Sequence, residues 1–378
     1  MPTRGSLASG NLQELEIRVV HVTDGARWAG IESHLWNLTR VSADPPLRHL
    51  VCFRTEGEPV RKFRSAGVKV QVLSGSHRRA VSALRRVLRD EAPDVLHMHG
   101  YLGVLIGSTA SLGLPPALVS TWHARIDRQA RPSSRIWWYS RLALRIPRWR
   151  GAHFIAVTDD IARDYRSRGA PERRVHVVRN GILPGALDGI RVVEYSRETP
   201  LRVTAIGSLI PVKDFNLLLR VARVLCKRGF EADFTIAGDG PLLPELEAEA
   251  AALNVAERVH FVGRIEDVSE LLARTDVLVF TSRSEGVPYV LLEALAAGLP
   301  VVAPPVGGFL EVLRHEESGL IAADRSPEAI ADCLARLVED GALRRSLAAG
   351  AASAASGELS AQRMSSEMGR VYAAACVH

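Results

Sequence analysis

The run Glu285-Gly286-Val287-Pro288-Tyr289-Val290-Leu291-Leu292-Glu293 joins a predicted strand to a predicted helix. Val277–Thr281, directly before it, is apolar and β-branched, which is typical of a buried strand. Strong helix formers follow at 294–297, and Gly298 and Pro300 end the helix. We therefore expect Glu285 in the loop at the carboxyl end of a strand, where open α/β sheets bind ligands. Glu293 is expected more than one turn into the helix.

The start of this helix suits an anionic ligand. Its first turn offers free backbone N–H groups and the positive end of the helix dipole, which favour a group such as a diphosphate. We expect Pro288 in that first turn, where a missing N–H costs no hydrogen bond. Carboxylates on both sides of a diphosphate, from Glu285 and Glu293, suit a ligand with hydroxyls at both ends. A nucleotide-sugar is such a ligand.

The chain of 378 residues is too long for one ordinary core and indicates two domains. Short apolar runs alternate with helical patterns in both halves, which favours parallel sheets covered on both faces. Pro184, Gly185, Gly189 and Pro200 interrupt this alternation and indicate a linker. We expect an α/β fold with an N-terminal domain at 1–185, a linker at 186–200, a C-terminal domain at 201–360 and a C-terminal helix at 361–378 that can pack back on the first domain.

The alternation predicts individual elements. The expected strands are Ile17–Val22, His49–Phe53, Val68–Leu73, Val95–Met98, Leu118–Thr121, Phe154–Val157 and Val175–Val178 in the first half, and Arg202–Ile206, Phe234–Ala237, Val259–Val262, Val277–Thr281 and Val301–Ala303 in the second. The expected helices include Ile31–Val41, Val81–Asp90, Val104–Leu112, Ile161–Ser167 and the amphipathic stretch Gln362–Ala375.

Composition indicates a soluble globular protein, with 47% apolar and 24% charged residues. No apolar run reaches the roughly 18 residues that span a bilayer, and residues 1–16 lack the apolar core of a secretory signal. The four cysteines lie far apart in the sequence, so we expect reduced thiols in a cytoplasmic protein. The net charge of +6 divides into +13 over residues 1–190 and −7 over 191–378. Any contact with an anionic surface is therefore expected in the first half.

Motifs in both halves follow one another in a recognisable order. They are Trp28–Glu32, Val95–Gly100, Thr121–His123 and Arg179–Gly181 in the first half, and Gly207–Lys213, Ala237–Pro241, the run from Glu285 to Glu293 and Gly307-Gly308 in the second. The ordered set resembles the retaining GT-B glycosyltransferases of family 4. The resemblance implies two Rossmann-like, doubly wound parallel-sheet domains facing a cleft. It also implies transfer of a hexose from a nucleotide-sugar to a glycan or lipid-linked acceptor, as in polysaccharide biosynthesis, with retention of the anomeric configuration.

The resemblance assigns roles to the charged residues of the second half. Glu285 holds hydroxyls of the donor sugar and stabilises positive charge near the reacting carbon; the alternative is a loop carboxylate that caps the next helix. Lys213 binds the diphosphate, and Glu293 accepts hydrogen bonds from the ribose; the alternative for both is a solvated side chain. The family often has an arginine at the position of Ser208, where a serine hydroxyl can still donate to phosphate.

Further donor-binding residues follow from the resemblance alone: Gly286, Val287, Pro288, Gly30 and Arg264. A glycine at a helix start, such as Gly30, lets the backbone come close to a phosphate. The family more often has two glycines there, and the first of them is Ala29 in this chain. Ordinary turn glycines are the alternative for Gly30 and Gly286.

Histidines at strand ends are candidates for the acceptor side. His123 follows the strand predicted at Leu118–Thr121, and the resemblance implies that it contacts the donor sugar or positions the acceptor. A histidine can also act as a base near neutral pH, but in retaining transfer the leaving diphosphate can take the acceptor proton. His99 is expected nearer the cleft than His97. A structural histidine is the alternative for both.

Several motifs are missing from the sequence. There is no Asp-x-Asp pair, so the metal-chelating motif of the other large glycosyltransferase fold is absent. GxxxxGK[ST], HExxH and GxSxG are absent as well. We therefore expect a transfer that needs no metal and no cofactor, with the nucleotide-sugar as co-substrate.

Residues 125–150 hold eight arginines and one acidic residue, with aromatic residues among them. On a helix from about Ser134 to Ile146, Trp137, Trp138, Arg141 and Arg145 would share one outer face. Arginine with tryptophan suits an anionic membrane surface, where a lipid-linked acceptor would be found. That predicts a cytoplasmic protein that can bind the inner face of the plasma membrane. A solvated basic helix is the alternative. Nucleic-acid binding is a third interpretation, but no recognition motif supports it.

Two other functions remain open from the sequence. A nucleotide-sugar epimerase of the same architecture would need proton-shuttling groups around the sugar and no acceptor. A non-catalytic subunit would keep the fold without turnover, which Ser208 and Ala29 favour and the presence of Glu285, Lys213 and His123 disfavours.

Overall fold

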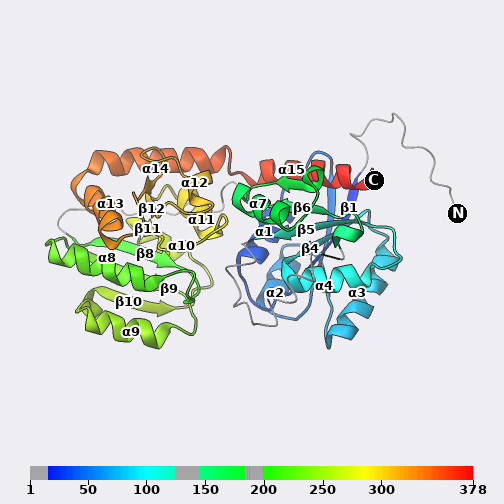
Figure 1. Ribbon diagram of the computed structural model, residues 1–378, viewed down its shortest axis with the longest axis horizontal. Helices are drawn as coiled ribbons and strands as arrows, with labels where there is room; N and C mark the ends of the chain where they lie inside the picture. Colours follow the sequence, from blue (N-terminus) through cyan, green and yellow to red (C-terminus); the bar gives the residue numbers. More distant parts are fainter. Residues whose placement is uncertain are drawn as a thin grey trace. The chain divides into compact units, whose positions relative to one another are not determined.

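The structure is a computed structural model that describes residues 16–123, 145, 147–183, 185, 187 and 199–377. These residues form two parallel sheets flanked by helices (Figure 1). Contacts divide the chain into two compact units. The first holds the described residues of Met1–Thr121, Tyr139–Ile155 and Gln362–His378, and the second those of Trp122–Trp138 and Ala156–Ala361.

The first sheet has seven strands in the order β3-β2-β1-β4-β5-β6-β7. Its elements are β1 (Ile17–Thr23), α1 (Gly30–Thr39), β2 (Leu47–Phe53), α2 (Glu58–Ser65), β3 (Lys69–Val72), α3 (His77–Glu91), β4 (Val95–His99), α4 (Gly100–Ala110), β5 (Ala117–Trp122), β6 (His153–Ala156), α7 (Asp159–Ser167) and β7 (Val175–Val177). β1 pairs in parallel with β2 on one side and with β4 on the other. The strand order therefore reverses between β1 and β4, and such a reversal is where doubly wound sheets bind ligands.

The second sheet repeats this topology with six strands in the order β10-β9-β8-β11-β12-β13. Its elements are β8 (Leu201–Ile206), α8 (Phe215–Lys227), β9 (Ala232–Ala237), α9 (Leu243–Ala252), β10 (Val259–Gly263), α10 (Ser269–Ala273), β11 (Val277–Val279), α11 (Tyr289–Ala296), β12 (Val301–Ala303), α12 (Phe309–Val312), β13 (Leu320–Ile321), α13 (Pro327–Glu339) and α14 (Gly341–Ser356). The order reverses between β8 and β11. The loops that follow these two strands therefore start side by side.

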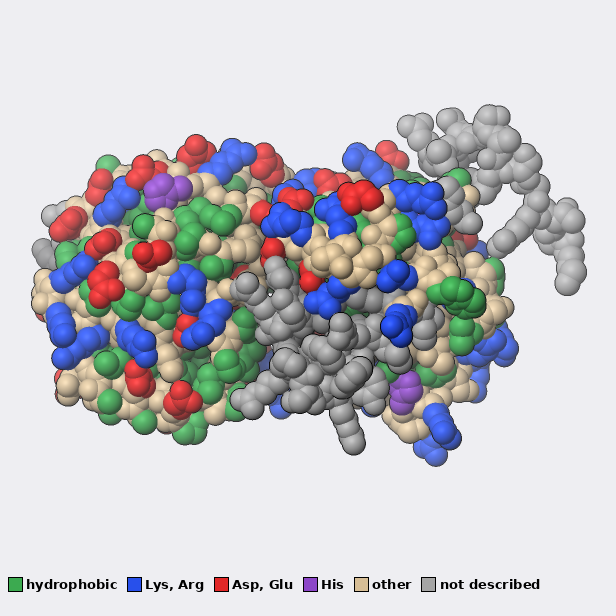
Figure 2. Space-filling view, in the orientation of Figure 1, with side chains coloured by type: hydrophobic (Ala, Val, Ile, Leu, Met, Phe, Trp, Pro, Cys, Tyr) green, Lys and Arg blue, Asp and Glu red, His purple; other side chains and the backbone are tan. Residues whose placement is uncertain are grey.

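Both faces of the second sheet are buried, as expected for parallel strands with continuous apolar runs. One core joins strand residues such as Val203 and Phe234 to Leu219 of α8 and Leu334 of α13. A separate core joins Leu278 and Val301 to helix residues that include Leu291, Leu295 and Phe309. Figure 2 shows basic and acidic side chains interspersed over the drawn face of this unit. The two apolar layers hold the carboxyl end of β11 rigidly beneath the loop that carries Glu285.

The expected α/β organisation is confirmed, since each expected strand is present with its ends shifted by at most two residues. The strand expected at Val277–Thr281 ends at Val279, after which Phe280 N still donates to Val302 O at 2.9 Å. Two short elements, α2 and β13, were not expected. In α2 only Pro59, Val60 and Phe63 are buried, which leaves too few apolar positions for a helical period to be visible.

The last helix, α15 (Ala361–Cys376), groups with the first unit and lies among the elements of the first sheet (Figure 1). Its Tyr372 is fully buried, and Tyr372 Oη is 2.7 Å from His97 Nδ1 in β4. A Cβ at Gly369 would lie 3.1 Å from Pro45, so the helix approaches the segment before β2 closely. In the described part of the chain, no helix is both long enough and apolar enough to cross a bilayer.

Candidate functional site

A cation and an anion meet at the strand-order reversal of the second sheet. Lys213, in the loop after β8, donates from Nζ to Glu285 Oε1 in the loop after β11. Ser282 Oγ donates to the same carboxylate oxygen at 2.7 Å. The side chains of Lys213 and Glu285 are only 20% and 11% exposed, so each offsets the cost of partly burying the other charge.

A second charged cluster holds the two loops in place. Asp214, which follows Lys213 in the left-handed region (φ 52°), is paired with Arg283 at 3.0 Å and with Arg325 at 2.6 Å. Arg325 also donates to Thr281 O at 3.2 Å, and Thr281 Oγ1 donates to Lys213 O at 3.1 Å. The chain at Lys213 and Asp214 and the backbone before Glu285 are therefore tied together, independently of the contact between the Lys213 and Glu285 side chains.

The Glu285 loop also packs directly on a glycine pair. Gly307 has φ +49°, and a Cβ there would lie 2.2 Å from Glu285 O. Gly308 N donates to Glu285 O at 3.1 Å, and a Cβ at Gly308 would lie 1.9 Å from Gly286 O. Only glycine permits this approach. The pair Gly307-Gly308, part of the sequence motif set, thus sets the path of the Glu285 backbone.

The start of α11 differs by one residue from the expectation. Pro288 lies just outside the helix as its N-cap, in an extended conformation with ψ 139°, and Tyr289 is the first helical residue. Val287 is buried, and its carbonyl accepts a hydrogen bond of 2.8 Å from Asn180 Nδ2. Asn180 belongs to the Arg179–Gly181 motif, for which the sequence suggested no role. Glu293 lies in the second turn of α11 and is half-buried.

Glu311 is a residue of this region that sequence reasoning missed. Its carboxylate accepts from the first two N–H groups of α7, at 2.9 Å from Asp159 N and 3.3 Å from Asp160 N. Arg179 Nη2 binds Asp159 at 3.0 Å and Glu311 at 3.3 Å. The carboxylate thus occupies the helix end that favours anions. The only signal in the sequence is its spacing, three residues after Gly308.

A pocket of about 510 Å³ adjoins these groups. It is lined by residues at the start of α7, residues before Glu285, and residues around Gly307: Asp159, Asp160, Arg163, Arg283, Ser284, Pro305, Val306, Gly307, Leu310 and Glu311. Its walls carry both signs of charge, so it can hold a polar ligand that offers hydroxyls as well as an anion.

Two family models match the chain in succession. "Glycosyltransferase Family 4" matches residues 15–184, and "Glycosyl transferases group 1" matches 189–353. The chain belongs to the group 1, family 4 glycosyltransferases. The fold comparison agrees: the crystal structure of Anabaena HepE in complex with UDP-glucose matches with a TM-score of 0.81, covering 95% of this chain and 100% of HepE at 19% identity. At that identity, the likeness shows the GT-B fold alone.

Two curated relatives show how far the sequence similarity extends. The amylovoran biosynthesis glycosyltransferase AmsK of Erwinia amylovora is 27% identical over 263 residues, which cover 65% of this chain and 61% of AmsK. The D-inositol 3-phosphate glycosyltransferase of Salinispora tropica is 28% identical over 384 residues, covering 91% of this chain and 77% of the relative. The chain thus spans less than two thirds of AmsK.

The remaining predicted site residues of this chain lie in several places. Gly30 is the first residue of α1 and is exposed, and a Cβ there would meet no atom within 4 Å. Ser208 and Arg264 are exposed, in the loops after β8 and β10. His123 is half-buried, and its carbonyl oxygen lies 2.7 Å from where a Cβ of Gly286 would be. The structure therefore brings Lys213, Glu285, Gly286 and the His123 backbone together in the second unit.

On the predicted acceptor side, few residues are described. His99 is 1% exposed and lies among other histidines, which matches the structural alternative for its side chain. Arg145 is exposed and helical. Trp137, Trp138 and Arg141 lie outside the described residues.

Glu32, in the first turn of α1, is a site candidate that the sequence placed only within a motif. Its side chain is 4% exposed. Burial raises the pKa of Glu32 to about 7. A carboxyl group that titrates near neutral pH can exchange protons with a ligand. No sequence signal marks it, because the burial is tertiary.

Glu32→Gln should remove a pH-dependent loss of stability. The folded-state pKa of about 7 lies above the ordinary 4.5. Glu32 therefore does not reduce the stability of the folded protein below pH 4.5, and it reduces that stability increasingly as the pH rises to 7. At 1.36 kcal/mol per pKa unit, the loss is on the order of 3 kcal/mol. Urea unfolding from pH 4 to 8 should show that the free energy of unfolding of the variant rises relative to that of the wild type between pH 4.5 and 7. Parallel curves, or an equal gain from Glu257→Gln on the exposed surface, would contradict the assignment.

Proposed function

We propose that this chain transfers a hexosyl group from a nucleotide-sugar to a glycan or lipid-linked acceptor, with retention of the anomeric configuration and without a metal ion. The observation that carries the proposal is the contact between Lys213 and Glu285. One cation and one anion, both largely shielded from water, lie where doubly wound sheets bind ligands. A nucleotide-sugar needs both: a cation for its diphosphate and an acceptor of hydrogen bonds for its sugar hydroxyls.

Donor binding exchanges partners at this contact. The diphosphate oxygens compete with Glu285 for the Lys213 ammonium, which then neutralises the charge that develops on the leaving nucleotide. Glu285, released from Lys213, accepts hydrogen bonds from the sugar hydroxyls and stabilises positive charge on the ring. Ser282 continues to orient its carboxylate.

The transfer breaks the bond between the anomeric carbon and the diphosphate and forms one to the acceptor oxygen on the same face. The departing diphosphate oxygen accepts the acceptor's proton. Glu293 and the exposed Ser208 and Arg264 bind the nucleotide, and His123 positions the sugar or the acceptor. Gly286, Val287, Pro288 and Gly30 present backbone to the donor.

Lys213→Ala should weaken nucleoside diphosphate binding by about 10- to 100-fold, because a charge-assisted hydrogen bond to phosphate is lost. Calorimetry with UDP, GDP, ADP and their sugar conjugates, with and without EDTA, measures this. Lys227→Ala, at the exposed end of α8, is the matched control. Nucleotide binding that is unchanged by EDTA and is weakened only in Lys213→Ala supports the proposal. If the wild type binds none of these compounds, the non-catalytic alternative takes its place.

Glu285→Gln should lower kcat by roughly 10²- to 10³-fold and change the donor Kd little, because the carboxylate acts mainly on charge in the transition state. Donor consumption with a panel of acceptors measures turnover, and Glu245→Gln on α9 controls for a surface charge change. Unchanged turnover would remove Glu285 from the mechanism. Conversion of the donor sugar without any acceptor would indicate an epimerase.

We also propose that the acceptor side binds an anionic membrane surface. Trp149 is 83% exposed, and the exposed Arg145 and Arg148 lie near it in sequence. Exposed tryptophan with arginine suits the headgroup region, where each basic residue contributes about 1 kcal/mol.

Arg145→Glu combined with Trp149→Ala should release the protein from phosphatidylglycerol vesicles in a flotation assay, with at least about a tenfold loss of binding. Phosphatidylcholine vesicles and the variant Arg78→Glu, on the exposed face of α3, are the controls. Equal flotation of all three proteins would leave this segment as ordinary surface.

A further inference from the structure

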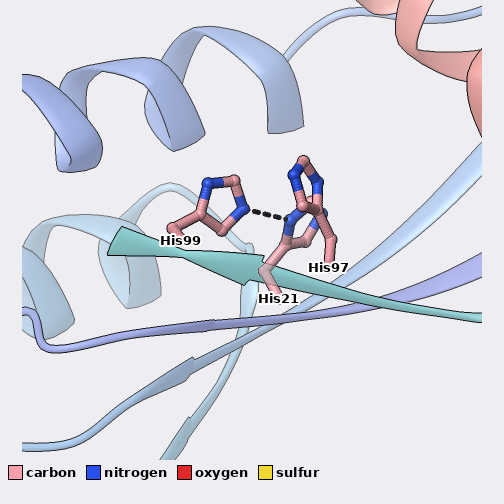
Figure 3. A group of neighbouring side chains, drawn as sticks. All are labelled: His21, His97 and His99. Atoms are coloured by element: carbon pink, nitrogen blue, oxygen red, sulfur yellow. Dashed lines mark hydrogen bonds between the residues drawn. The ribbon is translucent and has the colours of Figure 1, made fainter. Parts of the chain in front are cut away.

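Three buried imidazoles meet where the strand order of the first sheet reverses (Figure 3). His21 of β1 lies opposite His97 of β4 in the strand register, and His99 is two residues further along β4. Residues two apart in a strand share a face, so all three rings lie on one side of the sheet. They are 0%, 0% and 1% exposed. The transfer proposed above uses neither His21 nor His97.

The ring nitrogens converge. One nitrogen from each histidine lies within 4.8 Å of those of the other two. His21 Nδ1 and His99 Nε2 are 3.1 Å apart. Two imidazoles that share a tetrahedral zinc ion at about 2.0–2.1 Å have nitrogens roughly 3.4 Å apart. The His21 ring centroid is 5.3 Å from each of the other two, whereas the His97 and His99 rings are 4.0 Å apart and would have to open slightly.

The outward-facing nitrogens have partners of the kind that support metal ligands. His21 Nε2 is 2.9 Å from His49 Nδ1, and His97 Nδ1 is 2.7 Å from Tyr372 Oη. Ligating histidines almost always donate the other ring N–H in this way, which fixes the tautomer and the ring orientation. The remaining nitrogen of His97, Nε2, is 2.6 Å from the hydroxyl oxygen Oγ1 of Thr121.

We propose that His21 Nδ1, His97 Nε2 and His99 Nε2 form a binding site for zinc(II) or a similar first-row divalent metal. Imidazole ligands select zinc, copper, nickel or iron over magnesium and calcium, which require oxygen ligands. A water molecule hydrogen-bonded to Thr121 Oγ1 completes the coordination, and on a three-histidine zinc site such a water ionises near pH 7 and reduces the buried charge. Metal binding removes the proton shared between His21 Nδ1 and His99 Nε2. His99 then carries its ring proton on Nδ1.

The proposed transfer assigns no step to these three histidines. The ligands of the metal site belong to the first sheet, whereas Lys213 and Glu285 belong to the second unit. The chain without this metal can therefore still bind nucleotides, and the two proposals fail independently.

The test uses the full chain without a histidine tag, unfolded, stripped with chelator and refolded with or without metal, because the buried rings are most accessible during folding. Cobalt(II) serves as the spectroscopic probe and zinc(II) as its competitor. We expect one equivalent of cobalt with the intense visible bands of a tetrahedral site, displaced by one equivalent of zinc. His21→Gln and His99→Gln should abolish these bands, and His260→Gln, on the exposed surface of β10, should keep them.

Variants of the supporting residues keep the test decisive if the ligand variants fail to fold. His49→Gln and Tyr372→Phe leave all three ligands in place and should weaken metal binding by about 10- to 100-fold, with circular dichroism unchanged. No tetrahedral cobalt spectrum in the refolded wild type would overturn the proposal. Cobalt affinity that is equal in the wild type, His49→Gln and Tyr372→Phe would overturn it as well.

Discussion

The contact between Lys213 and Glu285 depends on one topological constraint, the adjacency of β8 and β11. The two residues are 72 positions apart in the sequence, and they meet because right-handed crossovers place β9 and β10 on one side of β8 and β11 to β13 on the other. Loops at the carboxyl ends of neighbouring parallel strands must start side by side. A ligand bound there can therefore touch the loops after β8 and β11 at once.

Near the loops after β8 and β11, several charged side chains form ion pairs or hydrogen bonds with other protein groups. Asp214 binds two arginines, and Glu311 satisfies the first N–H groups of α7 while it shares Arg179 with Asp159. Such pairs are costly to break on one side only. The exchange of partners proposed for Lys213 avoids that cost, because the diphosphate replaces the Glu285 carboxylate as the anion beside the ammonium. The ion pair between Asp214 and Arg325 keeps the two loops in place during the exchange.

The buried polar groups at the strand-order reversal of the first sheet differ from those of the second sheet. Its reversal between β1 and β4 is lined on one face by buried histidines that hydrogen-bond to one another and to Tyr372 and Thr121. Desolvation lowers the pKa of His21 well below its ordinary value and raises the pKa of Glu32 to about 7. Desolvation thus favours the neutral form of these two groups, whereas Lys213, Glu285 and Asp214 of the second unit form ion pairs.

The sequence by itself determined the alternation of strands and helices, and with it two α/β domains, because apolar β-branched runs and helix-stopping Gly298 and Pro300 act locally; the GT-B fold followed from the resemblance that the ordered motifs carry. The sequence also placed Glu285 in a loop after a strand. What it left undecided depends on residues distant in the chain. Only the folded chain joins Lys213 to Glu285, seats Glu311 on α7, and buries Glu32 and His21 deeply enough to shift their pKa values. The reason is physical: hydrogen bonds along a strand or helix follow the order of the chain, whereas desolvation and side-chain pairing depend on which segments tertiary packing brings together.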